Sequence, residues 1–422
     1  MGVNMKTVDH VRTRAHLTDE VTELEQRNRE ISREAAEEAI VLLENDGILP
    51  LKQGMSLALY GCGVTNTVKG GSGSGEVNER YSTSIYEGIK AEGFMIVNRD
   101  MLESYCKMAV SHRENYFKEQ QKKAGFLNFT VTMANLKAPY TAPDFPKLSE
   151  QDLKEADVCI YVVSRISGES YDRKLEKGDY YLSDSESTNL RLCMKHYGKV
   201  ILIINAGGQV DLREVSGCRF NAVIFSSMLG TDGGNAIAKV LSGKVNPSGH
   251  LTDTWIKNYE DIPGAMDYSY LNKNLEQEFY TEGIYVGYRY FDTKLVPVLY
   301  PFGYGKSYTS FQMNLTMFEG FEAGWGSLKA EVTNTGDREG KAVVQVYIKL
   351  PVGTFEKENR RLAGFAKTKL LAPEESETVS INFGFWDIAS FSDEKNGYVA
   401  EKGDYGVYIG ESIAVCRYAV LH

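Results

Sequence analysis

The sequence predicts an α/β fold with a doubly wound, mostly parallel sheet, followed by an all-β sandwich. In residues 27–257, short apolar runs rich in β-branched residues alternate with helical patterns, which is typical of strands joined by crossover helices. In residues 311–422, short strand patterns are separated by turn signals, which is typical of a sandwich. Residues 1–26 form a polar lead-in, and residues 258–310 form a tyrosine-rich connector between the two domains.

The composition is that of an ordinary globular protein: of 422 residues, 42% are apolar and 25% are charged, enough for two or three domains. The net charge of −10 argues against nucleic acid or an anionic membrane as a partner. No segment approaches the length of an apolar membrane span. The six cysteines are scattered, and the first residues lack the apolar core of a signal peptide, so we expect a reducing, cytoplasmic compartment. A homo-oligomeric assembly is left open.

The α/β part is expected to follow a regular order of helices and strands. The residues from 113 to 150 are polar and contain prolines, and their fold is left open. The periodicity of apolar residues predicts helices at 27–44, 81–90, 148–156, 183–196 and 232–241, and strands at 56–60, 158–163, 199–205 and 222–226.

Neither a nucleotide cofactor nor a metal ion is expected. The glycines at 61 and 63 follow a strand, but a dinucleotide fingerprint needs a third glycine where Asn66 stands. A phosphate-binding P-loop needs Lys after its last glycine, and Gly75 is followed by Glu76. The six dispersed histidines show no metal-ligand spacing.

A carboxylate, Glu169, stands on a glycine-containing loop directly after the predicted strand 158–163. In open α/β sheets, ligands bind in the crevice at the carboxyl ends of the strands, so a Glu in this position can reach a reactant. The alternative is a solvated surface residue in a charged loop, and the local sequence by itself favours that alternative.

The sequences of this loop and of three other segments resemble those of glycoside hydrolase family 3 β-glucosidases. SRISGESYDR at 164–173 is similar to the acid/base loop of that family, with Ser170 at a position where glycine is common. EEAIVLLENDGILPL at 37–51, EGIYVGYRYF at 282–291 and EVTNTGDREGKAVVQVYI at 331–348 are similar to its α/β domain entry, connector and C-terminal module. The resemblance implies that the sandwich is fibronectin type III-like, and the absence of a Cys…Trp…Cys spacing fits that fold better than an immunoglobulin domain.

The resemblance also implies site residues. Glu169 would be the general acid/base, and Ser74 of the KGGSGSG loop would bind the sugar. Asp172 and Arg173 are expected to order the acid/base loop, because arginine forms forked pairs with carboxylates. The Arg173 head group is expected to point away from Glu169, since a nearby cation would favour the ionised carboxylate.

The catalytic (β/α)8 barrel of that family, which carries the nucleophilic Asp in an S-D-W sequence, has no counterpart in this chain. The expected function is therefore the acid/base-carrying portion of a retaining β-glucosidase, inactive until a barrel completes it in cis or in trans. The alternative is a non-catalytic carbohydrate-binding or interaction protein built from the same domains. The choice between glucosidase and xylosidase specificity stays open.

Overall fold

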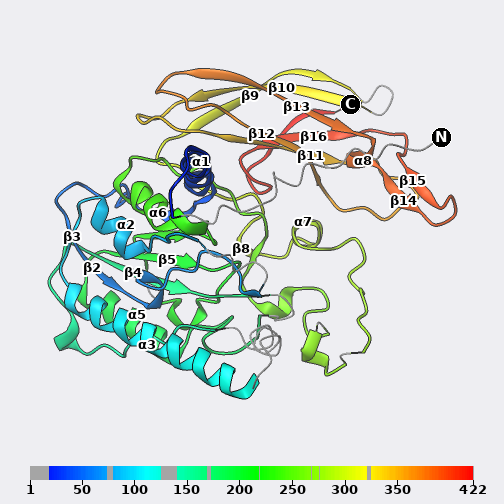
Figure 1. The fold of residues 1–422 in the computed structure, drawn as a ribbon. Coiled ribbons are helices and arrows are strands. Elements are labelled where there is room, and N and C mark those ends of the chain that lie inside the picture. The colour runs from blue at the N-terminus through cyan, green and yellow to red at the C-terminus, as the bar shows by residue number, and fades with distance from the viewer. Residues whose placement is uncertain are drawn as a thin grey trace, which may run out of the picture.

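The computed structural model describes residues 19–73, 79–124, 140–168, 173–217, 219–267, 269–274, 276–320 and 325–421. Figure 1 shows an α/β domain and a β-sandwich, with helix α1 (Glu23–Ala39) lying between them. The fold class predicted from the sequence is confirmed. In the described part of the chain, no helix is both long and apolar enough to cross a membrane.

The α/β domain is built on a six-stranded sheet with the spatial order β1-β6-β5-β4-β2-β3. All neighbouring strands are parallel except β1, which pairs antiparallel with β6. The two central strands are almost wholly buried, which explains their continuous apolar sequences. The strands are β1 (Val41–Asn45), β2 (Ser56–Tyr60), β3 (Met95–Ile96), β4 (Val158–Ser164), β5 (Val200–Asn205) and β6 (Ala222–Phe225).

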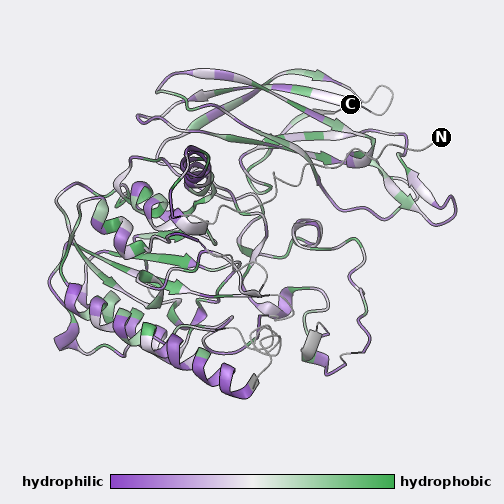
Figure 2. Ribbon diagram, in the orientation of Figure 1, coloured by the Kyte–Doolittle hydropathy of each residue, from purple (hydrophilic) through white to green (hydrophobic). Residues whose placement is uncertain are grey.

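Helices cover both faces of this sheet (Figure 1). α1, α2 (Ile85–Ala91) and α6 (Gly233–Ser242) lie on one face, and α3 (Arg99–Ala124) and α5 (Asp184–His196) lie on the other. Figure 2 shows hydrophobic residues along the strands of the sheet and a largely hydrophilic α3. This arrangement leaves the carboxyl ends of the parallel strands as the edge from which loops project.

The strand order creates one switch point in the sheet. From β2 the chain moves to β3 on one side, and it then crosses to β4 on the other side of β2 before adding β5 and β6. The connections that follow β2 and β4 therefore start at two neighbouring strands and lead to helices α2 and α5 on opposite faces of the sheet. A crevice at such a switch point is the usual ligand site of doubly wound sheets.

Three of the predicted elements need correction. The predicted helix 27–44 ends at Ala39, and the next residues form strand β1, because the fully buried run from Ile40 to Leu43 pairs with β6 at the sheet edge. The predicted helix 148–156 is only a 3-10 turn at Glu150–Asp152, held by the Ser149 cap. Helix α2 begins at its Ser84 cap and not at residue 81.

The region that the sequence left open is helical in its first part. Helix α3 continues to Ala124, and a buried stripe of Leu102, Tyr105 and Ala109 holds it against the domain. Residues 125–139 lie outside the described part of the chain, and the residues after Tyr140 run as coil to Ser149.

The sandwich consists of a three-stranded sheet, β13-β10-β9, facing a four-stranded sheet, β12-β11-β16-β17. Sequence patterns had missed β9 and β17, which lie at the sheet edges; in β9, alternating residues are exposed. A small hairpin of β14 (Ser390–Ser392) and β15 (Gly397–Val399) follows helix α8 (Phe385–Ile388). The sandwich strands are β9 (Phe311–Glu319), β10 (Trp325–Asn334), β11 (Val343–Lys349), β12 (Arg361–Lys367), β13 (Ser376–Gly384), β16 (Gly406–Gly410) and β17 (Arg417–Leu421).

The connector folds back onto the α/β domain before it enters the sandwich. It contains α7 (Tyr288–Lys294) and β8 (Val298–Tyr300), and β8 pairs with β7 (Trp255–Ile256). The Asn246 side chain accepts hydrogen bonds from the Ser307 hydroxyl and the Tyr308 amide, both at 2.8 Å.

Ion pairs also join the two domains. Glu38 on α1 binds Lys341 and Lys367 of the sandwich. Burial opposes ionisation of Glu38, but the hydrogen bonds from the two lysines outweigh it and lower the pKa of this carboxyl. Near neutral pH, the Glu38 carboxylate is therefore charged and can bind both lysines.

Helices α2 and α6 approach each other closely through two glycines. A Cβ placed on Gly88 would lie 2.1 Å from the Gly234 carbonyl oxygen, so Gly88→Ala must push the helices apart. Overpacking of this kind costs about 1–3 kcal/mol. We expect Gly88→Ala to lower the free energy of unfolding by that amount in urea denaturation.

The sign of this effect is diagnostic, because Gly→Ala in an unobstructed helix is normally stabilising by roughly 0.5–1 kcal/mol. Gly198→Ala, in the bend after helix α5, is the control for an added methyl group that meets no obstruction, since nothing lies within 4 Å of a Cβ at that position. A Gly88→Ala variant as stable as the parent would disprove the close helix contact.

Candidate active site

The two loops that lead to the predicted site residues leave the carboxyl ends of β2 and β4, next to the switch point of the sheet. Ser74, Glu169 and Asp172 themselves fall outside the described residues. The chain is described up to Gly73 in the first loop and up to Gly168 in the second. The placement of the two loops can therefore be judged from the residues that directly precede Ser74 and Glu169.

These two loops meet. The Ser72 amide donates a 2.9 Å hydrogen bond to the Ser167 carbonyl, and Ser72 forms a parallel bridge with Gly168. Glycine is required at 168 because a Cβ there would lie 2.0 Å from the Ser72 hydroxyl oxygen. The loop after β2 and the loop after β4 thus converge immediately before the two predicted site residues.

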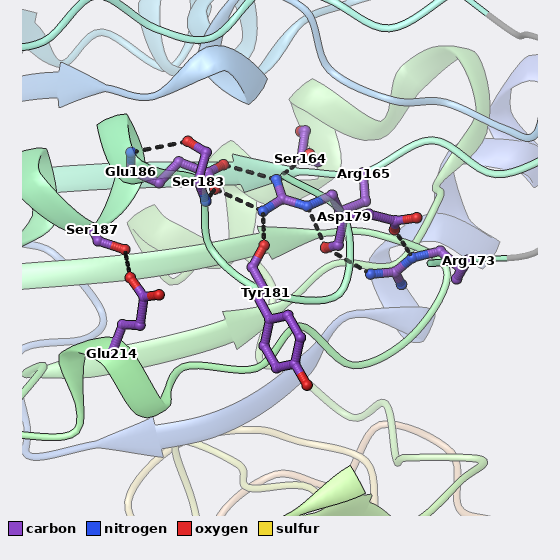
Figure 3. Close-up of polar contacts among 9 residues, drawn as sticks. All are labelled: Ser164, Arg165, Arg173, Asp179, Tyr181, Ser183, Glu186, Ser187 and Glu214. Carbon is purple, nitrogen blue, oxygen red and sulfur yellow. Dashed lines mark hydrogen bonds and ion pairs between the residues drawn. The ribbon is translucent and has the colours of Figure 1, made fainter. Parts of the chain in front are cut away.

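Arg165, the second residue of the SRISGESYDR motif, braces the base of the acid/base loop (Figure 3). Its guanidinium forms a two-fold ion pair with Glu186, at 2.7 and 2.6 Å. It also donates to the carbonyl oxygens of Ser164, Asp179 and Tyr181, at 2.8, 2.6 and 3.2 Å. One side chain therefore joins the residue that ends β4 to the returning arm of the loop.

The Arg165–Glu186 pair is almost fully buried, with 6% and 4% of each residue exposed. Burial by itself would lower the pKa of Arg165, but the Glu186 carboxylate raises it, so the guanidinium stays charged. Glu186 also caps helix α5, where its carboxylate accepts from the Ser183 amide at 2.8 Å. The ion pair thereby fixes the loop to the start of a helix.

Arg173 is the first described residue after Gly168, and its guanidinium forms an ion pair with the Asp179 carboxylate. Its guanidinium also donates to the Asp179 carbonyl at 3.0 Å, and the other Asp179 carboxylate oxygen accepts from the Lys174 amide at 2.6 Å. The position of Arg173 relative to Glu169 stays a prediction, because Glu169 is not described.

A residue that the sequence analysis missed, Asn205, stands at the carboxyl end of β5. Its side-chain oxygen accepts from the Val68 amide and the Ser164 hydroxyl, at 2.7 and 2.9 Å. Its side-chain nitrogen donates to the carbonyls of Val68 and Ser227, at 2.9 and 2.6 Å. The only sequence signal was a polar residue at the end of an apolar strand, VILIIN.

A cysteine, Cys62, stands at the start of the loop after β2. Burial, with a smaller effect of the Glu186 carboxylate, raises the pKa of the Cys62 thiol to about 11, so it is protonated at neutral pH. Within the described ranges, no three His, Cys, Asp or Glu residues are placed to hold a metal ion. The reactive group that the sequence predicts for this edge is the Glu169 carboxyl, which lies outside the described residues.

Comparison with known proteins defines the class to which this fold and site belong. Residues 40–288, more than half of the chain, match the model of the glycosyl hydrolase family 3 C-terminal domain. Residues 342–413 match the fibronectin type III-like domain. The chain belongs to glycosyl hydrolase family 3.

The relatives are β-glucosidases. β-Glucosidase A of Butyrivibrio fibrisolvens is 34% identical over 93% of this chain, and the β-glucosidase of Ruminococcus albus is 33% identical over 91%. β-Glucosidase 3B of Thermotoga neapolitana, solved in complex with α-D-glucose, is 35% identical over 94% of this chain with a TM-score of 0.78. The matches cover only 50%, 39% and 54% of these proteins, so the chain spans about half their length or less.

We expect Arg165→Met to destabilise the α/β domain by about 3–5 kcal/mol, because it leaves the Glu186 carboxylate buried without a partner. Urea-induced unfolding followed by circular dichroism measures the change.

Lys195→Met serves as the control on helix α5. Lys195 pairs with Glu150 at the surface, where both side chains are about three-quarters exposed, so its removal should cost less than about 1 kcal/mol. Equal effects of the two substitutions would show that the buried pair has no special role.

Proposed function

We propose that this chain is the acid/base-carrying portion of a retaining β-glucosidase that hydrolyses terminal β-D-glucosyl residues of oligosaccharides or aryl glucosides. The observation that carries the proposal is the junction of the two loops at Ser72 and Gly168, beside the switch point of the sheet. Ser74 and Glu169 follow that junction by two residues and one residue. A sugar in the crevice would therefore meet a hydroxyl from one loop and a carboxyl from the other.

In this proposal Glu169 protonates the glycosidic oxygen as the bond to the leaving group breaks. It then removes a proton from the water that releases the sugar. Ser74 hydrogen-bonds the sugar, and Asp172 and Arg173 keep the loop in place. The Arg173–Asp179 pair supports this division of roles, because it satisfies the guanidinium within the returning arm of the loop.

A retaining mechanism needs a second carboxylate about 5–5.5 Å from the first, to attack the anomeric carbon. The described carboxylates nearest the acid/base loop do not suit that role. Asp179 is engaged by Arg173, and Glu186 is buried beneath Arg165. The nucleophile is therefore assigned to a (β/α)8 barrel, supplied in cis or in trans.

The connector offers a surface on which such a barrel could rest. Several of its large apolar side chains are exposed, and Figure 1 shows the segment looping away from both domains. Exposed large apolar side chains gathered on one segment favour an interaction site there. The exposed residues are Met266, Phe279, Tyr280, Ile284, Val286 and Leu295.

The purified chain by itself is expected to bring about no turnover of an aryl β-glucoside. It supplies a proton carrier but no attacking carboxylate, and its half-site is open to water, where stabilisation of the transition state is weak. The assay compares the chain with its Glu169→Gln variant. Turnover that disappears in the variant would show that the chain is a complete enzyme and would end the half-enzyme proposal.

Adding the part of the Butyrivibrio fibrisolvens relative that this chain does not match should restore cellobiose hydrolysis. In that mixture, Glu169→Gln should reduce turnover by about 100- to 10,000-fold, since general acid/base catalysis contributes about that much. Activated aryl glucosides, whose leaving groups need little protonation, should lose less in the first step. A mixture equally active with either form of the chain would remove Glu169 from the mechanism.

A further inference from the structure

Three segments at the carboxyl edge of the sheet bind the same buried side-chain amide, that of Asn205. Val68 belongs to the loop after β2 that leads to Ser74, Ser164 ends the strand that leads to Glu169, and Ser227 follows β6. The Asn205 side chain forms one or two hydrogen bonds with each of them, and only 1% of the residue is exposed. No other described side chain contacts all three loops through hydrogen bonds.

The chemistry at this point requires an amide. A primary amide offers an oxygen that can accept two hydrogen bonds and a nitrogen that can donate two. Here the oxygen faces two donors and the nitrogen faces two carbonyls, so all four capacities are used and only one orientation fits. A carboxylate would place lone pairs against the carbonyls of Val68 and Ser227, and an apolar residue would leave all four partners unsatisfied.

The neighbouring backbone reinforces the same arrangement. Ser227 has a φ of 53°, a conformation that a non-glycine residue adopts only when its surroundings hold it. The Lys69 carbonyl, next to Val68, accepts a 2.9 Å hydrogen bond from the Gly230 amide. The loops after β2 and β6 are therefore joined at two places, at Val68 through the Asn205 side chain and directly at Lys69.

We propose that Asn205 is the positioning residue that holds the Ser74 loop and the Glu169 loop in one arrangement, because its amide binds Val68 of the first loop and Ser164 at the base of the second. This inference rests on the function proposed above. In an enzyme that must place a sugar-binding hydroxyl and a proton carrier on the same substrate, such a tie sets the distance between them.

The test uses the whole chain and needs neither sugar nor turnover, so its outcome is independent of the outcome for the proposed function. Hydrogen exchange reports the protection of the Ser72 amide, whose bond to the Ser167 carbonyl joins the two loops. In Asn205→Asp, we expect this protection to fall by roughly 10- to 100-fold at neutral pH, as two hydrogen bonds are lost. Amides in the middle of β5 should keep their protection.

Asn205→Asp should also introduce a pH dependence. The four partners of this side chain are uncharged, and burial raises the pKa of a carboxyl facing two carbonyl oxygens. Below that pKa, the protonated acid donates to one carbonyl and restores part of the protection of the Ser72 amide from hydrogen exchange. This protection is lost again as the pH rises above the pKa of the introduced carboxyl. The parent chain should show no such step once intrinsic exchange rates are removed.

Asn189→Asp is the matched control. Asn189 is equally buried and also bonds one backbone amide and one carbonyl, those of Leu148 and Pro146, far along the chain from either loop. It should leave the Ser72 amide protected. If Asn205→Asp does not fold, Asn205→Ser gives the same readout without a charge. Unchanged Ser72 protection, or an equal loss in Asn189→Asp, would overturn the proposal.

Discussion

Where the strands of this sheet end, the backbone of the following loops no longer has strand partners for its hydrogen bonds. The Asn205 side-chain amide binds three such groups, the amide and carbonyl of Val68 and the carbonyl of Ser227. Buried donors and acceptors must be paired, since each unpaired one costs about 1–3 kcal/mol. One side chain with two donors and two acceptors meets that requirement for three loops without adding a charge. The rest of the site depends on this constraint. The switch point brings the loops together, and the Arg165–Glu186 pair holds the far arm of one of them.

The site therefore combines two kinds of polar contact. Near the sheet the contacts are buried, namely the neutral Asn205 amide and the Arg165–Glu186 ion pair, so salt screens them little. Farther out, Arg173 and Asp179 form a partly exposed ion pair that closes the loop on itself. This combination of contacts suits the proposed catalytic role of the loop. The base of the loop keeps a fixed position, while the charge of Arg173 is balanced by Asp179 within the loop. A carboxyl that must act as an acid is then not obliged to face an unpaired arginine.

The sequence was sufficient for β2, β4, β5 and β6 of the α/β sheet, because buried parallel strands such as β4 and β5 are continuous apolar runs, but it gave no signal for the two-residue strand β3. It failed at residues 40–44, where an apolar run fits a helix or a strand equally well, and pairing with β6 decides. Helix α3 was missed because only a narrow stripe of its surface is buried. Within the site, the motif indicated Glu169 and Ser74. It could not indicate Glu186 or Asn205, whose partners lie on distant segments, so no local pattern records the contact.

The antiparallel strand β1 has a consequence for how the domain is made. It pairs with β6, and the backbone of Leu42 also bridges to Lys306 in the connector. During synthesis, the first strand of the domain must therefore wait unpaired until nearly all the residues of the sheet have emerged. Contacts of such long sequence separation form slowly, and unpaired apolar strands are prone to aggregation. The run from Ile40 to Leu43 is thus the segment that a chaperone would most need to shield while this chain leaves the ribosome.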